Sequence, residues 1–412
     1  MRPRTIPLLL AVTSVIALAG CAAQPSAESL PAESAVPHGY VEGATEMQEP
    51  QLRLVTLDSA GGLTAFDPAT EQSIEMASTT DVMHLSTDGR YAYLASATSG
   101  SLRIIDTGAW TVPHGDHSHY YLAEPRDVGV IDDAAESGDA RVSSSVEYTA
   151  AFFPASGTTV VLDREALGTS TVTELGRISG SPHAGVAIPL GDFILVSTAT
   201  GAAGSSSVRV LQPDGTATEL SAECADLSDG AITRVGVVFA CRDGALLATL
   251  TESGTVSFDR IQYPAGTAPG DIATSFAARP DRPSVAAVAG DRGAWLLNTR
   301  ALEWNFVPTD EPLLRATAVG DSGDTIVGVA ASGSIVVLDK AGVVATTDPV
   351  LADDLSGGEL PPGIRVEVDI ARAYVNSPSA GVVYEIDYAD GARVARTFET
   401  AGSPLLLAET GR

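Results

Sequence analysis

The chain has 412 residues, of which 52 are Asp or Glu and 24 are Lys or Arg, so its formal net charge is −28 at pH 7. A surface this acidic repels the phosphates of nucleic acids and of anionic lipid head groups, which excludes nucleic-acid binding and attachment to membranes through basic patches. Histidine is rare, with six residues, so a cluster of histidines calls for a chemical explanation.

The N-terminus has the pattern of a secretory signal. Arg2 and Arg4 precede an apolar run from Ile6 to Ala17, which is too short to span a bilayer. The run ends in Leu18-Ala19-Gly20-Cys21, the bacterial lipobox, in which the cysteine becomes the first residue and carries a lipid. An ordinary signal peptide with an incidental cysteine is the alternative. We predict a signal peptide over residues 1–20 and an extracytoplasmic protein anchored to the bacterial cell membrane through lipidated Cys21.

A flexible tether follows over residues 21–48, because this segment is rich in Ala, Pro, Ser and Glu and has no apolar periodicity. From about Gln51 the pattern changes to short β-branched runs that alternate with turns of Gly, Asp, Ser and Pro. Helical periodicity is nearly absent from there to the end of the chain. The sequence therefore predicts an all-β domain over residues 49–412.

The β-branched runs repeat at intervals of roughly 40–55 residues, the period of four-stranded propeller blades. Eight units begin near Leu52, Asp81, Ala140, Pro182, Ala231, Ile272, Leu314 and Ile364. The first unit lacks an innermost strand, which the segment Ser403–Ala408 could supply to close the ring. We predict a single β-propeller of eight four-stranded blades closed by the C-terminal strand. Seven blades remain an alternative, because units two and seven carry insertions, and a pair of β-sandwiches is a weaker one.

Two cysteines, Cys224 and Cys241, remain once Cys21 is assigned to the lipid. An even pair in an exported protein predicts a disulfide, and the loop between them is of a length for which a disulfide contributes roughly 3 kcal/mol of stability. Two buried free thiols are the alternative.

Half of the histidines lie in one run, His114-Gly115-Asp116-His117-Ser118-His119, which is inserted into the second unit. His117 and His119 are two residues apart, so an extended segment directs both side chains to one side. A turn at Gly115 can bring His114 to the same point, and Asp116 is either a further ligand or the partner that fixes an imidazole tautomer. These ligand types suit Zn²⁺, although they do not by themselves exclude copper, nickel or manganese. A solvated polar loop is the structural alternative.

Two more histidines lie at predicted inner strands, which line the channel of a propeller. His183 precedes one inner strand and His84 lies in another, so both could complete the metal site, although a structural role is usual for a single histidine. His38 lies in the tether and is expected to be incidental unless it captures metal transiently. The sequence contains no Gly-x-Ser-x-Gly elbow, phosphate-binding loop or haem-attachment motif, so we predict that the protein is not an enzyme.

The segment Trp110–Tyr121 resembles the His-Gly-Asp-His-x-His-Tyr motif of AztD-type zinc metallochaperones. Shorter matches to the same family follow at Val41–Glu46, Thr149–Phe153, His183–Leu190 and Cys224 with Phe239–Gly244, the last of which resembles the family disulfide. The family has histidines at several positions where this sequence has Ala184, Arg141, Ser145 and the turn Ser228–Gly230. The resemblance therefore does not carry over a second zinc site.

This resemblance implies an extracytoplasmic β-propeller that binds Zn²⁺ and delivers it to the solute-binding protein of a zinc ABC transporter. The implied ligands are His114, Asp116, His117 and His119, with His183 as a further candidate, and we expect a monomer. Two other classes remain open. One is a propeller lactonase or hydrolase that holds a metal in its channel. The other is a non-catalytic interaction propeller with the histidine run at its surface.

Overall fold

The computed structural model describes residues 38–79, 81–114, 117–133, 140–199 and 206–412. Residues His38–Arg412 form one compact unit. The predicted signal peptide and the lipidation site Cys21 lie outside the described residues. Within those residues, no helix is both long and apolar enough to cross a membrane.

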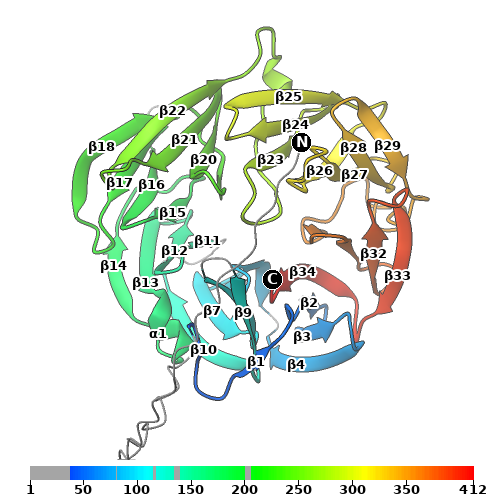
Figure 1. Ribbon diagram of the computed structural model, residues 1–412, viewed down its shortest axis with the longest axis horizontal. Coiled ribbons are helices and arrows are strands. Elements are labelled where there is room, and N and C mark those ends of the chain that lie inside the picture. The colour runs from blue at the N-terminus through cyan, green and yellow to red at the C-terminus, as the bar shows by residue number, and fades with distance from the viewer. Residues whose placement is uncertain (1–37, 80, 115–116, 134–139, 200–205) are drawn as a thin grey trace, which may run out of the picture. The chain divides into compact units, whose positions relative to one another are not determined.

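Eight antiparallel sheets of the described chain follow one another around a ring, and each packs on the next (Figure 1). The first sheet consists of β34 (Pro404–Thr410), β2 (Arg53–Asp58), β3 (Gly62–Asp67) and β4 (Gln72–Ser78). The second consists of β5 (Val82–Thr87), β6 (Tyr91–Ser96), β7 (Ser101–Asp106) and β10 (Arg126–Asp132). The third consists of β11 (Arg141–Ser144), β12 (Tyr148–Phe153), β13 (Thr158–Asp163) and β14 (Glu174–Ile178).

The remaining sheets continue in chain order. The fourth contains β15 (Ala187–Leu190), β16 (Phe193–Ala199), β17 (Ser206–Leu211) and β18 (Ala217–Glu223). The fifth contains β19 (Asp229–Ile232), β20 (Val237–Cys241), β21 (Gly244–Leu250) and β22 (Val256–Gln262). The sixth contains β23 (Ser284–Val288), β24 (Gly293–Asn298) and β25 (Glu303–Pro308), and Ala277 bridges to Ala286 in place of a fourth strand.

The last two sheets complete the ring. The seventh contains β26 (Leu313–Ala318), β27 (Ile326–Ala330), β28 (Ile335–Asp339) and β29 (Gly342–Thr346). The eighth contains β30 (Val366–Val368), β31 (Ala373–Ser377), β32 (Val382–Asp387) and β33 (Arg393–Glu399). Two short helices, α1 (Arg164–Gly168) and the 3₁₀ turn Pro269–Asp271, are the helical elements of the described residues. The predicted all-β propeller is confirmed.

The ring closes through the two ends of the propeller chain. β34 pairs antiparallel with β2, so that Ala408 lies opposite Val55 and Leu406 opposite Leu57. The C-terminal segment therefore supplies the innermost strand that the first unit lacks, as predicted. Because the first and last parts of the chain share one sheet, the ring cannot open without breaking this ladder.

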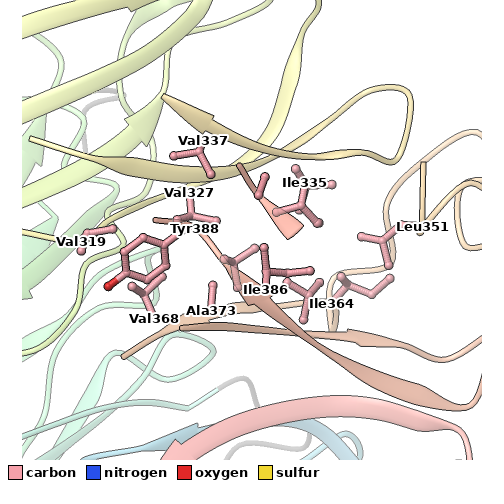
Figure 2. Packing of buried hydrophobic residues seen from close by; sticks show 14 residues of the cluster. Val319, Val327, Ile335, Val337, Leu351, Ile364, Val368, Ala373, Ile386 and Tyr388 are labelled. Atoms are coloured by element: carbon pink, nitrogen blue, oxygen red, sulfur yellow. The ribbon is translucent and has the colours of Figure 1, made fainter. Parts of the chain in front are cut away.

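Burial along the strands reflects their position in the ring. Middle strands such as β20 are buried at every residue, because neighbouring sheets cover both of their faces. The outer strand β18 is exposed at most of its residues, since one edge faces solvent. Figure 2 shows the apolar layer between the seventh and eighth sheets, where Val327, Ile335 and Ile386 are fully buried. Burying each such side chain contributes about 1.5–3 kcal/mol.

The predicted disulfide is present between Cys224 and Cys241, whose Cα atoms are 5.1 Å apart. Cys224 follows β18 of the fourth sheet and Cys241 ends β20 of the fifth, so the bond links two neighbouring sheets. Both cysteines are buried in the apolar cluster between these sheets.

The folded unit begins earlier than the sequence predicted. Residues 38–48 were assigned to the tether, yet they belong to the compact unit and contain β1 (Thr45–Met47). This strand joins β8 (Ala109–His114) and β9 (His117–Leu122) in a separate three-stranded sheet in the order β1-β9-β8. Its residues are mostly exposed, which explains why no apolar pattern marked it as a strand.

Candidate metal centre

The three histidines of the run lie on two paired strands, His114 at the end of β8 (Ala109–His114) and His117 and His119 in β9 (His117–Leu122). We call β8 and β9 the histidine hairpin; it connects the third and fourth strands of the second sheet, β7 and β10. In its ladder His114 lies opposite His117, and Val112 lies opposite His119. Since residues opposite one another in a sheet share a face and every second residue returns to it, all three imidazoles lie on one face of the hairpin.

The three imidazoles are close enough to share one ion. One possible ligand atom from each of His114, His117 and His119 lies within 4.8 Å of the others. Nδ1 of His114 and Nε2 of His119 are 3.3 Å apart, which equals the separation of about 3.3 Å between two nitrogens on a tetrahedral zinc with Zn–N bonds near 2.0–2.1 Å. Asp116, the fourth predicted ligand of this run, lies outside the described residues.

A carboxylate that the sequence analysis did not assign to the site completes its outer layer. Oε1 of Glu46 lies 2.6 Å from Nδ1 of His119. Glu46 pairs with Tyr121 in the β1–β9 ladder, two residues from His119 and on the same face. When Nδ1 of His119 donates its hydrogen to this carboxylate, the lone pair on Nε2 is available to a metal, and the carboxylate fixes the orientation of the ring.

Aromatic stacking supports the same face of the hairpin below the triad. Trp110 lies opposite Tyr121 in the ladder, and their ring centroids are 5.2 Å apart. The guanidinium of Arg90 lies 3.8 Å from the centroid of the Trp110 ring and forms a buried ion pair of 2.7 Å with Asp106 at the end of β7. The stacked rings therefore stabilise the hairpin itself, and the cation–π contact with Arg90 fixes it to the second sheet.

The start of the compact unit also packs against this face. Tyr121 donates a hydrogen bond of 2.7 Å to the carbonyl of His38, and Trp110 Nε1 donates one of 3.3 Å to the carbonyl of Gly39. The His38 ring stacks on His114 with centroids 5.0 Å apart. A histidine that was expected to be incidental in the tether is therefore in contact with the triad.

The environment of His114 favours the neutral imidazole. Its pKa is lowered below the usual value, first by partial desolvation and then by the neighbouring rings of His38, His117 and His119. Neutral imidazole is the form that binds metal ions, so His114 needs to lose little or no proton to do so near neutral pH.

His183 is placed elsewhere, with both ring nitrogens engaged by the protein. Its Nδ1 donates to the carbonyl of Ser181 over 2.7 Å, so its Nε2 accepts from the hydroxyl of Ser197 over 2.9 Å. The ring also contacts Phe152 edge to face, with centroids 5.0 Å apart. In this arrangement His183 fixes the segment that leads into β15.

His84 lies in β5 beside Arg365, and Nη2 of Arg365 is 3.4 Å from Nδ1 of His84. Both residues line a cavity of about 80 Å³.

The topology of the ring separates His84 and His183 from the histidine hairpin. In a four-stranded meander, the connections between strands one and two and between three and four lie at one end of the ring. The start of the first strand lies at the other end. The histidine hairpin is a three-to-four connection, whereas His84 and His183 lie near the starts of the first strands β5 and β15. The structure thus brings three of the predicted ligands together and leaves these two apart from them.

No family model matches this chain, and no curated protein matches it. Among solved structures, AztD from Citrobacter koseri is similar, with a TM-score of 0.73 and 17% identity over 88% of this chain and 99% of AztD. Apo AztD from the same organism gives 0.71 and 15%, over 88% of this chain and 98% of AztD. The dihydro-heme d1 dehydrogenase NirN, in complex with DHE, gives 0.54 and 14%, over 88% of this chain and 75% of NirN. The chain therefore has the propeller fold of AztD, which agrees with the resemblance found in the sequence.

Proposed function

We propose that this protein is an extracytoplasmic zinc-binding metallochaperone, which holds Zn²⁺ on the histidine hairpin and delivers it to the solute-binding protein of a zinc ABC transporter. The observation that carries the proposal is the triad of His114, His117 and His119, whose ligand atoms lie within 4.8 Å of one another. The motif that resembles AztD-type metallochaperones and the AztD-like fold support the same function.

The chemistry of the triad suits zinc that has to be released. Three imidazole nitrogens leave the fourth tetrahedral position for water or for a ligand from a partner. His114 and His117 are exposed and His119 is half-buried, so an incoming ligand can reach the ion and replace one imidazole at a time. Zinc held in this way exchanges between proteins more readily than zinc enclosed by four protein ligands.

A carrier fits this position better than a hydrolase does. A catalytic metal acts on a substrate that is held beside it, usually in a concave site. The triad lies on an exposed hairpin, and it does not line either the cavity of about 380 Å³ between sheets or the one of about 80 Å³ beside His84. Sustained turnover of a lactone or ester by the zinc-loaded protein would favour the hydrolase instead.

The compartment belongs to the same proposal. A disulfide between Cys224 and Cys241 suits an oxidising, extracytoplasmic location. Lipidation of Cys21 would hold the propeller close to the transporter at the membrane. Mass spectrometry of the protein purified from its native membrane would detect the lipid on Cys21.

Zinc titration of a double variant tests the site. Replacing His117 and His119 together, His117→Ala with His119→Ala, removes two of three ligands and should abolish tight binding of one zinc in isothermal calorimetry. The folded state should persist, because both side chains are at the hairpin surface and outside the apolar core. His183→Ala is the matched control and should bind zinc as the unmodified protein does. Tight binding by the double variant would place the zinc site elsewhere.

A further inference from the structure

Three arginines line a cavity of about 380 Å³ that spans the fifth, sixth and seventh sheets. Arg234 lies in the connection between β19 and β20, Arg282 directly precedes Pro283 and β23, and Arg300 follows β24. These are connections between strands one and two or between three and four, so the cavity opens at the end of the ring that carries the histidine hairpin. Its volume lies within the range of small-molecule sites.

The guanidinium groups of this cavity are unpaired in a protein with an excess of carboxylates. In the part of the chain that the structure describes, Arg234, Arg282 and Arg300 form no ion pair. Acidic residues outnumber basic ones by 52 to 24, so chance would supply partners easily. The Nε atom of Arg282 is buried and has no hydrogen-bond partner. Leaving such a buried donor unsatisfied is unfavourable, and more so for a charged group such as a guanidinium.

The acidic residues that line the cavity, Asp321 and Asp324, are already engaged by other residues. Asp321 accepts hydrogen bonds from the backbone and the hydroxyl of Thr325, at 2.9 and 2.8 Å. Asp324 pairs with Lys340 at 2.7 Å. The cavity is therefore lined by arginines without ion-pair partners and by carboxylates that other residues hold.

The backbone around the cavity holds its arginines in place. Gly320 has φ +68°, and a Cβ atom there would lie 2.4 Å from Cβ of Arg282. Any other residue at this position would displace Arg282. Oδ1 of Asn298 accepts from the backbone N–H groups of Arg300 and Ala301, at 3.1 and 3.0 Å, so its amide nitrogen is the atom that remains to donate into the cavity.

A fourth arginine, Arg279, adds positive charge near Arg282. Arg279 is 9% exposed, and its pKa is lowered by burial and then by the nearby charge of Arg282. The pKa of Arg279 is raised by Tyr388 and Asp369 to a smaller extent. Positive charge is thus concentrated at one place on an otherwise acidic molecule, and this concentration attracts anions.

We infer that this cavity is a binding site for a small multivalent oxyanion, either a phosphate or a polycarboxylate, which is held by Arg234, Arg282 and Arg300. The planar guanidinium fork matches two oxygens of a carboxylate or phosphate and forms short, charge-assisted hydrogen bonds. A bound oxyanion would also provide the partner that Nε of Arg282 lacks. The inference concerns residues remote in sequence from the histidine hairpin and does not depend on zinc binding.

Calorimetric titration of the metal-free protein with inorganic phosphate and, separately, with citrate tests this site. Ionic strength is held constant with sodium chloride, so that general screening cannot produce the signal. We expect saturable binding of one of the two anions, and the anion that binds more tightly identifies the class. Arg234→Ala combined with Arg300→Ala should weaken this binding by about tenfold or more, because the charge-assisted hydrogen bonds of two guanidinium groups are lost.

Arg209→Ala is the matched control, since Arg209 is an exposed arginine of β17 in the fourth sheet. This variant removes the same kind of charge away from the cavity and should bind the anion as the unmodified protein does. The thermal unfolding midpoint of each variant verifies that the propeller is folded. The inference is overturned if neither anion binds saturably, or if the double arginine variant binds as tightly as the control.

Discussion

At the scale of single residues, the pairing of His119 with Glu46 determines how the triad can work. A neutral imidazole has one protonated nitrogen, and the carboxylate 2.6 Å from Nδ1 of His119 holds the proton there. Nε2 then faces Nδ1 of His114 across 3.3 Å. Glu46 is 43% exposed at its side chain, so its contribution to folding is small, and its main effect is on the tautomer and orientation of His119.

Glu46→Gln tests this role. Glutamine keeps the shape of the side chain but removes the charge that stabilises a metal-bound His119. Zinc affinity should therefore fall by about 10–100-fold, as is usual when an outer-layer partner is lost, while the unfolding midpoint changes little. Competition with a chelator of known affinity measures the change. Glu49→Gln, an exposed neighbour beyond β1, is the control, and equal affinities in the two variants would contradict the role of Glu46.

The residues of the triad were predictable and their partners were not. The spacing of His117 and His119 places both on one face of a strand, and the structure has them there. Glu46 is 73 residues from His119 in the sequence, and their contact depends on β1 pairing with β9. That strand has three residues and is mostly exposed, so no local sequence pattern predicts it. The contact of His38 with His114 depends on the same docked segment.

At the scale of elements, the second sheet, which carries the histidine hairpin, is joined to the third sheet by the hydrogen bonds of one carboxylate, Asp88. Asp88, in the turn between β5 and β6, accepts a hydrogen bond of 3.0 Å from Nε of Arg164 at the start of α1. It also accepts from the hydroxyl of Tyr93 at 2.8 Å and the backbone of Tyr91 at 2.9 Å. Burial alone would raise the pKa of Asp88, but Arg164 and these donors outweigh it and lower the pKa to about 2.

Asp88→Asn should therefore reduce stability in a pH-dependent way. A carboxyl group whose pKa is lower in the folded state than in the unfolded chain stabilises the fold above the unfolded pKa, and this stabilisation is lost as the pH falls toward 2. Its charge contributes roughly 2 kcal/mol at pH 6 and about half of that at pH 3. Urea unfolding of the variant and the unmodified protein at both pH values measures the difference. Asp259→Asn, at an exposed position of β22, should have little effect, and an equal loss at both pH values for Asp88→Asn would contradict the electrostatic cause.

At the scale of the whole compact unit, closure of the ring depends on β34. Leu407 of this strand lies in one apolar cluster with Leu54 of the first sheet and Val383 of the eighth. The strand therefore both completes the first sheet and packs it against the last one. Because strands from the two ends of the chain share the first sheet, loss of either end disrupts the ring, and unfolding of the propeller should be cooperative.

Leu407→Ala tests this closure. The substitution leaves a cavity at the junction of the first and eighth sheets and should lower the free energy of unfolding by about 2–5 kcal/mol. Leu405→Ala in the same strand is the control: its side chain is 41% exposed, and the loss should be below about 0.5 kcal/mol. Denaturant unfolding followed by tryptophan fluorescence measures both. Equal losses in the two variants would show that packing at the closure does not control stability.

The fold was predictable because its signal repeats. Seven of the eight strand groups begin within a few residues of the starts that the periodicity predicts. The sixth has a bridge at Ala277 instead of a first strand. The placement of His84 and His183 was not predictable in this way. Whether these two histidines can reach the triad depends on which end of the ring each one occupies. That position follows from the strand order within each sheet.

A crystal structure of the zinc-loaded protein, with anomalous scattering measured at the zinc absorption edge, tests the central claim most directly. With one equivalent of zinc, we predict a single strong anomalous peak on the histidine hairpin, within bonding distance of His114, His117 and His119. A peak beside His183 or His84, or no peak at the hairpin in protein shown to contain one zinc, would contradict the account.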